Sequence, residues 1–202
     1  ANDFVIDQIQ KRGIRVKHAP FYEWLDYQEY INTQVGIPQT WASWFSAKLQ
    51  LFILETLFNT AAKIMGWGHL ARAKDQLAVA EDYVRYQLEG EAGLTLGGGI
   101  YEWTHHEIDA VMSLGPHECM PSKIAEAQFF HVAEDMGLYS NTLHLNGDPV
   151  DPVVIENFVY EVKERFATRD ARRAAHPVAP TTTGDVAKGI LKELIRGLPK
   201  RS

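Results

Sequence analysis

Residues 108–167 alternate between short apolar runs and longer amphipathic ones, and this alternation limits the fold more than any other feature of the chain. The runs IDAVMSLG (108–115) and SNTLHLNG (140–147) are compact and typical of buried strands. A helical pattern follows each of them, at 122–137 and at 151–167. This order predicts a parallel sheet with right-handed crossovers, because parallel strands need a long connection between them.

The ends of these two helices carry start and stop signals. Ser122 stands near the start of the first and Gly137 at its end, while Asp151 caps the second and Pro152 occupies its first turn. The buried face of the second helix is predicted from its spacing to contain Ile155, Val159, Val162 and Phe166.

The part of the chain before residue 108 is mostly helical in pattern. A helix is predicted at 2–12, a short strand near 14–18 and an aromatic-rich helix at 21–34. In an α/β fold, a helix that leads into a strand usually has a strand before it. We therefore expect a further strand upstream of Ala1 and a longer native protein.

The segment 41–65 carries two rows of apolar residues, which predict a helix buried on more than one side. Another helix is predicted at 69–88, so that a helical insertion occupies about 40–90. The first row contains Trp41, Phe45, Leu49, Ile53, Leu57, Ala61 and Ile64, and the second contains Leu51, Leu54, Phe58, Ala62 and Met65.

Together these patterns predict a three-layer α/β domain over 1–167, with a short parallel sheet and a helical insertion. Its strands are expected near 14–18, 109–114 and 140–145. Residues 168–202 are predicted to form a linker and a C-terminal amphipathic helix. A chain of 202 residues is long enough to bury such a core.

Charge and composition exclude several functions. The net charge is −6, with about +6 in residues 163–202 and about −12 in the rest, so the acidic body gives no support to nucleic-acid binding. This uneven charge is compatible with a homodimer. One cysteine excludes an internal disulfide framework and favours a cytoplasmic location. The most apolar run, at 49–58, is too short to cross a membrane.

The only cysteine, Cys119, lies in the motif GPHECMP (115–121). The predicted strand ends at Gly115, so Cys119 is expected in the next loop or the first turn of the next helix. Ligands bind at this carboxyl end of the strands in open α/β sheets. Free N–H groups at a helix start favour a thiolate. Pro116 and Pro121 are expected to hold the loop in a fixed shape.

The residues alone leave three roles open for Cys119: a buried small hydrophobe, a nucleophile or a metal ligand. A zinc site through His117, Glu118 and Cys119 is disfavoured, because adjacent residues rarely converge on one metal and no CxxC or HExxH pattern occurs. A nucleophile needs a positioned base. The candidate bases are His105, His106, His117, His131 and His144.

The run IDAVMSLGPHECMPSKIAEAQFF resembles the C-terminal region of the activase-related proteins of the 2-hydroxyacyl-CoA dehydratase and benzoyl-CoA reductase system. That family shows a strand, then Gly-Pro, an apolar and a variable residue, Cys-Met-Pro and a helix with Ile-Ala-Glu-Ala. NTLHLNGDPVDPVVIENFVYEV and the opening NDFVIDQIQKRGIRVKHAPFYEWLDY are also similar to family segments, so the resemblance covers about residues 1–167. His117 stands where the family usually has an apolar residue.

The resemblance implies an iron–sulfur protein with a three-layer Rossmann-like α/β domain, which takes part in ATP-driven, low-potential electron transfer to CoA thioester substrates. Cys119 matches the family cysteine and would ligate a [4Fe–4S] or related cluster. Gly115 and Pro116 would shape its loop, with His117 and Glu118 beside the cluster. Because a cubane cluster usually needs about four cysteines, the other ligands are expected upstream or on a partner subunit.

No phosphate-binding loop occurs in the sequence, and the triple glycine at 97–99 is interpreted as a flexible turn. ATP hydrolysis is therefore expected elsewhere in the system. Two rival functions stay open. One is a non-catalytic α/β binding or scaffold module in which Cys119 is packing. The other is an unrelated enzyme that uses a histidine and the thiol.

Overall fold

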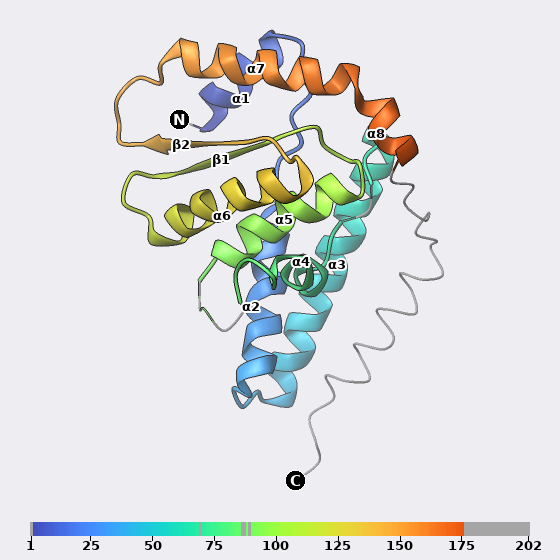
Figure 1. The fold of residues 1–202 in the computed structure, drawn as a ribbon. Helices are drawn as coiled ribbons and strands as arrows, with labels where there is room; N and C mark the ends of the chain where they lie inside the picture. Colours follow the sequence, from blue (N-terminus) through green and yellow to red (C-terminus); the bar gives the residue numbers. More distant parts are fainter. Residues whose placement is uncertain (1, 69, 86–87, 89, 176–202) are drawn as a thin grey trace.

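The computed structural model of the chain describes residues 2–68, 70–85, 88 and 90–175, and Figure 1 shows their arrangement. Helices dominate, and a short parallel sheet lies among them. The elements follow in the order α1 (Asn2–Lys11), α2 (Phe21–Val35), α3 (Trp41–Met65), α4 (Ala73–Ala80), α5 (Ala92–Thr104), β1 (Val111–Pro116), α6 (Met120–Met136), β2 (Ser140–Leu145), α7 (Pro152–Ala167) and α8 (Arg169–Ala175).

The sheet consists of β1 and β2, which pair in parallel with Val111 opposite Ser140 and Pro116 opposite Leu145. This confirms the parallel pairing and the predicted strand at 140–145, whereas β1 begins two residues later than the predicted 109–114. Figure 1 shows α1 and α7 over one face of the sheet and α5 and α6 over the other. The described residues thus form a small α/β arrangement.

The two faces of β1 belong to two separate apolar clusters, because successive side chains of a strand point in opposite directions. On one face, Met112 packs against a cluster that includes Val5 of α1 and Ile155 of α7. On the other face, Val111 packs against a cluster that includes Phe129 of α6. The sheet is therefore held by helices from both ends of the described chain.

The buried face of α7 is largely as predicted, with Ile155, Val159 and Val162 in the core. The prediction for Phe166 is wrong, since its side chain is 58% exposed, and Phe158 is buried in its place. Phe166 lies in the last turn of α7. There the Arg169 guanidinium lies 5.5 Å from the centre of its ring.

The predicted strand near 14–18 is wrong. Residues 14–20 have no regular secondary structure, although Ile14 and Val16 pack in the same apolar cluster as Met112 and Leu114 of β1. The segment thus lies beside the sheet without joining its ladder. The segment and β1 both line a cavity, which is described below.

The interpretation of residues 97–99 as a flexible turn is also wrong, because these glycines lie inside α5. A Cβ atom at Gly97 would stand 2.1 Å from the carbonyl oxygen of Gln76 in α4. A Cβ atom at Gly99 would stand 3.0 Å from the ring of Phe129 in α6. Glycine is needed here because two other helices pack directly on the α5 backbone.

The helical insertion is only partly as predicted. α3 confirms a helix at 41–65, but α4 occupies a small part of the helix predicted at 69–88 and is followed by turns. The predicted burial of α3 on more than one side is wrong: its buried residues are Leu51, Glu55 and Ala62, which lie on one side. In Figure 1, α2 and α3 extend away from the sheet.

A buried polar cluster joins α2, α3 and α4. Arg72 donates a hydrogen bond of 2.7 Å to the Tyr22 hydroxyl, and its guanidinium lies 3.0 Å from Glu55. Asp26 accepts a 2.8 Å hydrogen bond from the backbone N–H of Ala73. Burial lowers the pKa of Arg72, but the neighbouring Tyr22, Asp26 and Glu55 outweigh it and raise this pKa overall. One buried cation thus contacts polar groups of both α2 and α3.

At the C-terminal end, α8 occupies Arg169–Ala175, where the predicted linker and tail region begins. The remaining predicted linker and amphipathic helix, at 176–202, lie outside the described residues. Within the part of the chain that the structure describes, no helix combines the length and apolar character needed to cross a membrane.

Candidate functional site

Cys119 lies between β1 and α6, at the carboxyl end of the sheet, and forms the N-cap of α6. Its backbone N–H donates a 3.1 Å hydrogen bond to the carbonyl of Pro116, and its carbonyl accepts one of 3.0 Å from Lys123. The side chain makes no capping hydrogen bond, and the residue is partly exposed. The predicted position of Cys119 is confirmed, and the residue is not fully buried.

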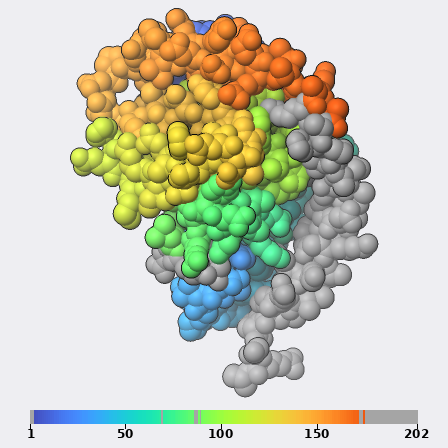
Figure 2. Space-filling view, viewed as in Figure 1, coloured from blue at the N-terminus to red at the C-terminus, as the bar shows by residue number. Residues whose placement is uncertain are grey.

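The loop that carries Cys119 is at the edge of the molecule. Figure 2 shows it beside the yellow surface of α6. Pro116, His117 and Glu118 are all exposed there. The His117 ring meets the ring of His144 edge-on, with 6.0 Å between the ring centroids. In the structure, the predicted site residues His117 and Glu118 are therefore surface residues that directly precede Cys119.

Gly115 has a packing reason to be glycine. A Cβ atom at this position would stand 2.5 Å from the hydroxyl oxygen of Ser122 and 2.9 Å from its Cβ. Ser122 is buried in the first turn of α6. The end of β1 therefore approaches α6 closely, and this approach fixes the loop that presents Cys119.

A polar cluster that the sequence analysis missed lies next to this loop. His144 of β2 contacts Glu126 of α6 at 2.9 Å, and the Lys123 ammonium donates a 3.1 Å hydrogen bond to the same carboxylate oxygen. Burial raises the pKa of Glu126, but hydrogen bonds from His144 and Lys123 outweigh it and lower this pKa overall. In the parallel register, Gly115 lies opposite His144, which brings His144 close to the loop after β1. Predicting this register would have located the cluster.

The residues that the structure describes do not by themselves form an iron–sulfur site. Among them, no group of three or more histidine, cysteine, aspartate or glutamate side chains is placed to hold a metal ion. Cys119 is the only cysteine of the chain, whereas a cubane cluster usually needs about four cysteine ligands. Any cluster at this position therefore requires ligands from another polypeptide segment.

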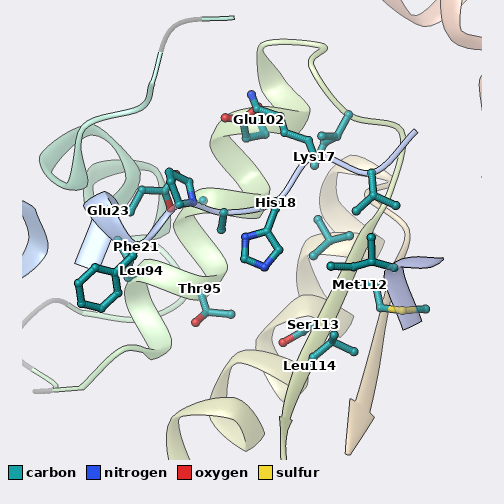
Figure 3. Close-up of a pocket in the computed structure, with 18 of the residues that line it drawn as sticks. Lys17, His18, Phe21, Glu23, Leu94, Thr95, Glu102, Met112, Ser113 and Leu114 are labelled. Atoms are coloured by element: carbon teal, nitrogen blue, oxygen red, sulfur yellow. The ribbon is translucent and has the colours of Figure 1, made fainter. Parts of the chain in front are cut away.

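A second feature near the sheet is a cavity of about 510 Å³ between residues 16–24, α5 and β1. Figure 3 shows the extended segment with Lys17 and His18 across the cavity from Met112 and Leu114 of β1. Most of its lining is apolar and includes Val5, Ile9, Val16, Phe21, Leu94, Met112 and Leu114.

The cavity lies along the open edge of β1. Because Val111 donates its N–H to Tyr139 on the β2 side, the alternate residues Met112 and Leu114 direct their backbone groups away from β2. In the described part of the chain, β2 is the strand that pairs with β1. Among the described residues, the other edge of β1 therefore has no paired strand, and residues of β1 line the cavity.

Two carboxylates line the cavity. Burial raises the pKa of Glu23 to about 7. Burial also raises the pKa of Glu102, although the ammonium of Lys17 pairs with it and opposes the shift. The wall of the cavity thus combines apolar side chains with a glutamate whose pKa is raised by burial.

Fold and site together define a small, helix-rich α/β unit with a partly exposed thiol at the carboxyl end of a parallel sheet. No protein-family model matches the chain, and neither the search of curated proteins nor the search of solved structures returned a match. The family resemblance therefore rests on the motif around Cys119, and it stays a prediction.

Proposed function

We propose that this chain is an iron–sulfur electron-transfer domain related to the activation machinery of 2-hydroxyacyl-CoA dehydratases and benzoyl-CoA reductases. In this proposal, Cys119 supplies one cluster ligand in a cytoplasmic, Rossmann-like protein. The observation that carries it is the partly exposed, uncapped side chain of Cys119 at the start of α6. The N–H groups of a helix start stabilise a thiolate and donate hydrogen bonds to cluster sulfur.

The other ligands would come from a segment outside the 202 residues, on an upstream domain or a partner subunit. The open edge of β1 gives this segment a place. A strand added in parallel to β1 has its carboxyl end at the same edge as Cys119. The loop after such a strand would lie beside the thiol, and the added strand would also complete the predicted sheet.

When bound, a cluster of this kind accepts and releases one electron at a potential set by its surroundings. The residues of this chain would shape those surroundings. Gly115 and Ser122 fix the distance between the loop and α6. Lys123 stands one turn into the helix, and its ammonium pairs with Glu126 at 3.1 Å.

The test is anaerobic reconstitution of the complete natural polypeptide with iron and sulfide. We expect the Cys119→Ser variant to lose the broad visible absorption of the cluster and a large part of its iron. The control Glu134→Gln, an exposed position further along α6, should retain both. Full iron content and absorption in Cys119→Ser would reject the proposal.

A second candidate is a non-catalytic α/β binding or scaffold module. The open edge of β1 beside an apolar cavity favours it, because such an edge is a ready place for a partner strand. In that case, Cys119 has no chemical role, and the Cys119→Ser variant behaves like the native protein in every iron measurement. The reconstitution experiment therefore separates the two candidates.

A further inference from the structure

α3 exposes a continuous apolar surface. Seven large side chains of this helix are between 47% and 82% exposed, and we call them the α3 face. Two of them, Trp41 and Phe45, stack on each other with 5.5 Å between ring centroids. The α3 face contains Trp41, Phe45, Leu49, Phe52, Ile53, Leu57 and Ile64.

The spacing of these residues makes the α3 face broad. At about 100° per residue, the seven side chains span about 160° of the helix circumference. The buried residues Leu51, Glu55 and Ala62 fall within about 40° on the other side of the helix. The sequence thus places apolar residues around most of α3, while the described chain covers only a narrow part of it.

The area of the α3 face is that of a stable interface. Large apolar side chains have roughly 200 Å² of surface each, so the exposed fractions amount to roughly 800 Å². The largest apolar patch of a typical monomer is only about 300–600 Å². A standard protein interface buries about 800 Å² on each partner. The α3 face alone therefore matches one half of a standard interface.

The charged residues of α3 leave this surface nearly uncharged. The Lys48 ammonium lies 3.3 Å from Glu29 of α2, and the Glu55 carboxylate lies 3.0 Å from Arg72. Both charged residues therefore form ion pairs within the protomer. Lys63, in the last turn, is the remaining charged residue of the helix. Two copies of the α3 face can therefore meet without repulsion between like charges over most of its length.

We propose that the α3 face is the interface of a homodimer, in which α3 packs against α3 of a second copy around a twofold axis. Such an interface requires one surface that is complementary to itself, and a nearly uncharged apolar face meets this condition. α3 is about 37 Å long and already packs against α2. The pairing therefore produces a four-helix assembly from two α2–α3 hairpins. This proposal does not depend on a cluster at Cys119.

Analytical ultracentrifugation of the full chain from about 1 to about 100 µM tests the proposal. We expect the native chain to be dimeric and the variant Leu49→Glu/Leu57→Glu to be monomeric, with at least about 100-fold weaker association. Both positions are exposed in the protomer, so helix content by circular dichroism should be unchanged. Phe130→Glu is the matched control, because Phe130 is 64% exposed on α6 and lies outside the α3 face.

Three results would overturn the proposal. The first is a native chain that is monomeric over the whole range. The second is a dimer that the two glutamates do not weaken, or that Phe130→Glu weakens equally. The third is a monomer that dimerises only after Leu191→Asp/Ile195→Asp, which would show that the C-terminal segment of the same chain covers the α3 face.

Discussion

At Gly97, the backbone of α5 approaches the carbonyl oxygen of Gln76 so closely that no side chain fits. We expect Gly97→Ala to destabilise the fold by about 1–3 kcal/mol, because α4 and α5 must move apart. The neighbouring Gly98→Ala is the matched variant, since the nearest atom to its Cβ is 3.7 Å away. It should stabilise the helix by about 0.5–1 kcal/mol, and urea unfolding followed by circular dichroism measures both.

If both alanine variants changed stability in the same direction, the close approach of α4 to Gly97 would be wrong. The three glycines also show what a local pattern misses. A triple glycine predicts a turn from its own chain entropy. Here Gly97 and Gly99 are required by contacts with α4 and α6, which are distant in sequence.

Glu23 predicts a dependence of stability on pH. Its pKa is about 7 in the folded chain and 4.5 when exposed, so the folded chain binds the proton more tightly. The free energy of unfolding should therefore fall as the pH rises from about 4.5 to 7, by up to about 3 kcal/mol from this group. We expect Glu23→Gln to remove this fall and to stabilise the chain at pH 8.

Thermal or urea unfolding at several pH values checks this dependence, with Glu118→Gln as an exposed control. An equal pH profile in Glu23→Gln and the native chain would show that burial of Glu23 does not control it. Glu23 itself was not predictable, since its burial depends on the cavity between α2, α5 and β1.

Among the elements, α2, α3 and α4 depend on Arg72. Arg72→Met removes the guanidinium that lies 3.0 Å from the carboxylate of Glu55, a residue that is 6% exposed. We expect this variant to lose about 3 kcal/mol of stability, because breaking a buried ion pair by removing one member is costly. Arg72→Met/Glu55→Gln should regain part of the loss, and a double-mutant cycle measures the coupling. A double variant no more stable than Arg72→Met would contradict the ion pair.

The helices and strands that depend on residues close together in the sequence were predictable. Those that depend on contacts between distant segments were not. The order from β1 to α7 follows from apolar spacing and from caps such as Asp151, which accepts a 2.9 Å hydrogen bond from Val153. The strand predicted near 14–18 fails because a strand needs a hydrogen-bonded partner, and this segment packs beside β1 through apolar side chains such as Val16 without pairing with it. The two-sided burial of α3 fails because spacing shows which residues are apolar and not what covers them.

The candidate site also has a part that the sequence predicts and a part that it does not. The position of Cys119 at the start of α6 follows from the order of a strand, a proline-flanked loop and a helix, so the sequence predicts it. The contact of His144 with Glu126 joins β2 to α6, and it needs the parallel register as well as the helix rotation. The register and the rotation of α6 both depend on contacts between segments that are distant in sequence.

For the whole molecule, the central claim is that Cys119 is an accessible thiol that ligates iron together with ligands from outside the 202 residues. Alkylation by iodoacetamide, quantified at Cys119 by peptide mass spectrometry, tests this claim directly. We predict rapid alkylation in the 202-residue chain alone and strong protection in the complete natural polypeptide after anaerobic loading with iron and sulfide. A thiol that does not react in the chain alone, or that reacts equally before and after loading, would contradict the account.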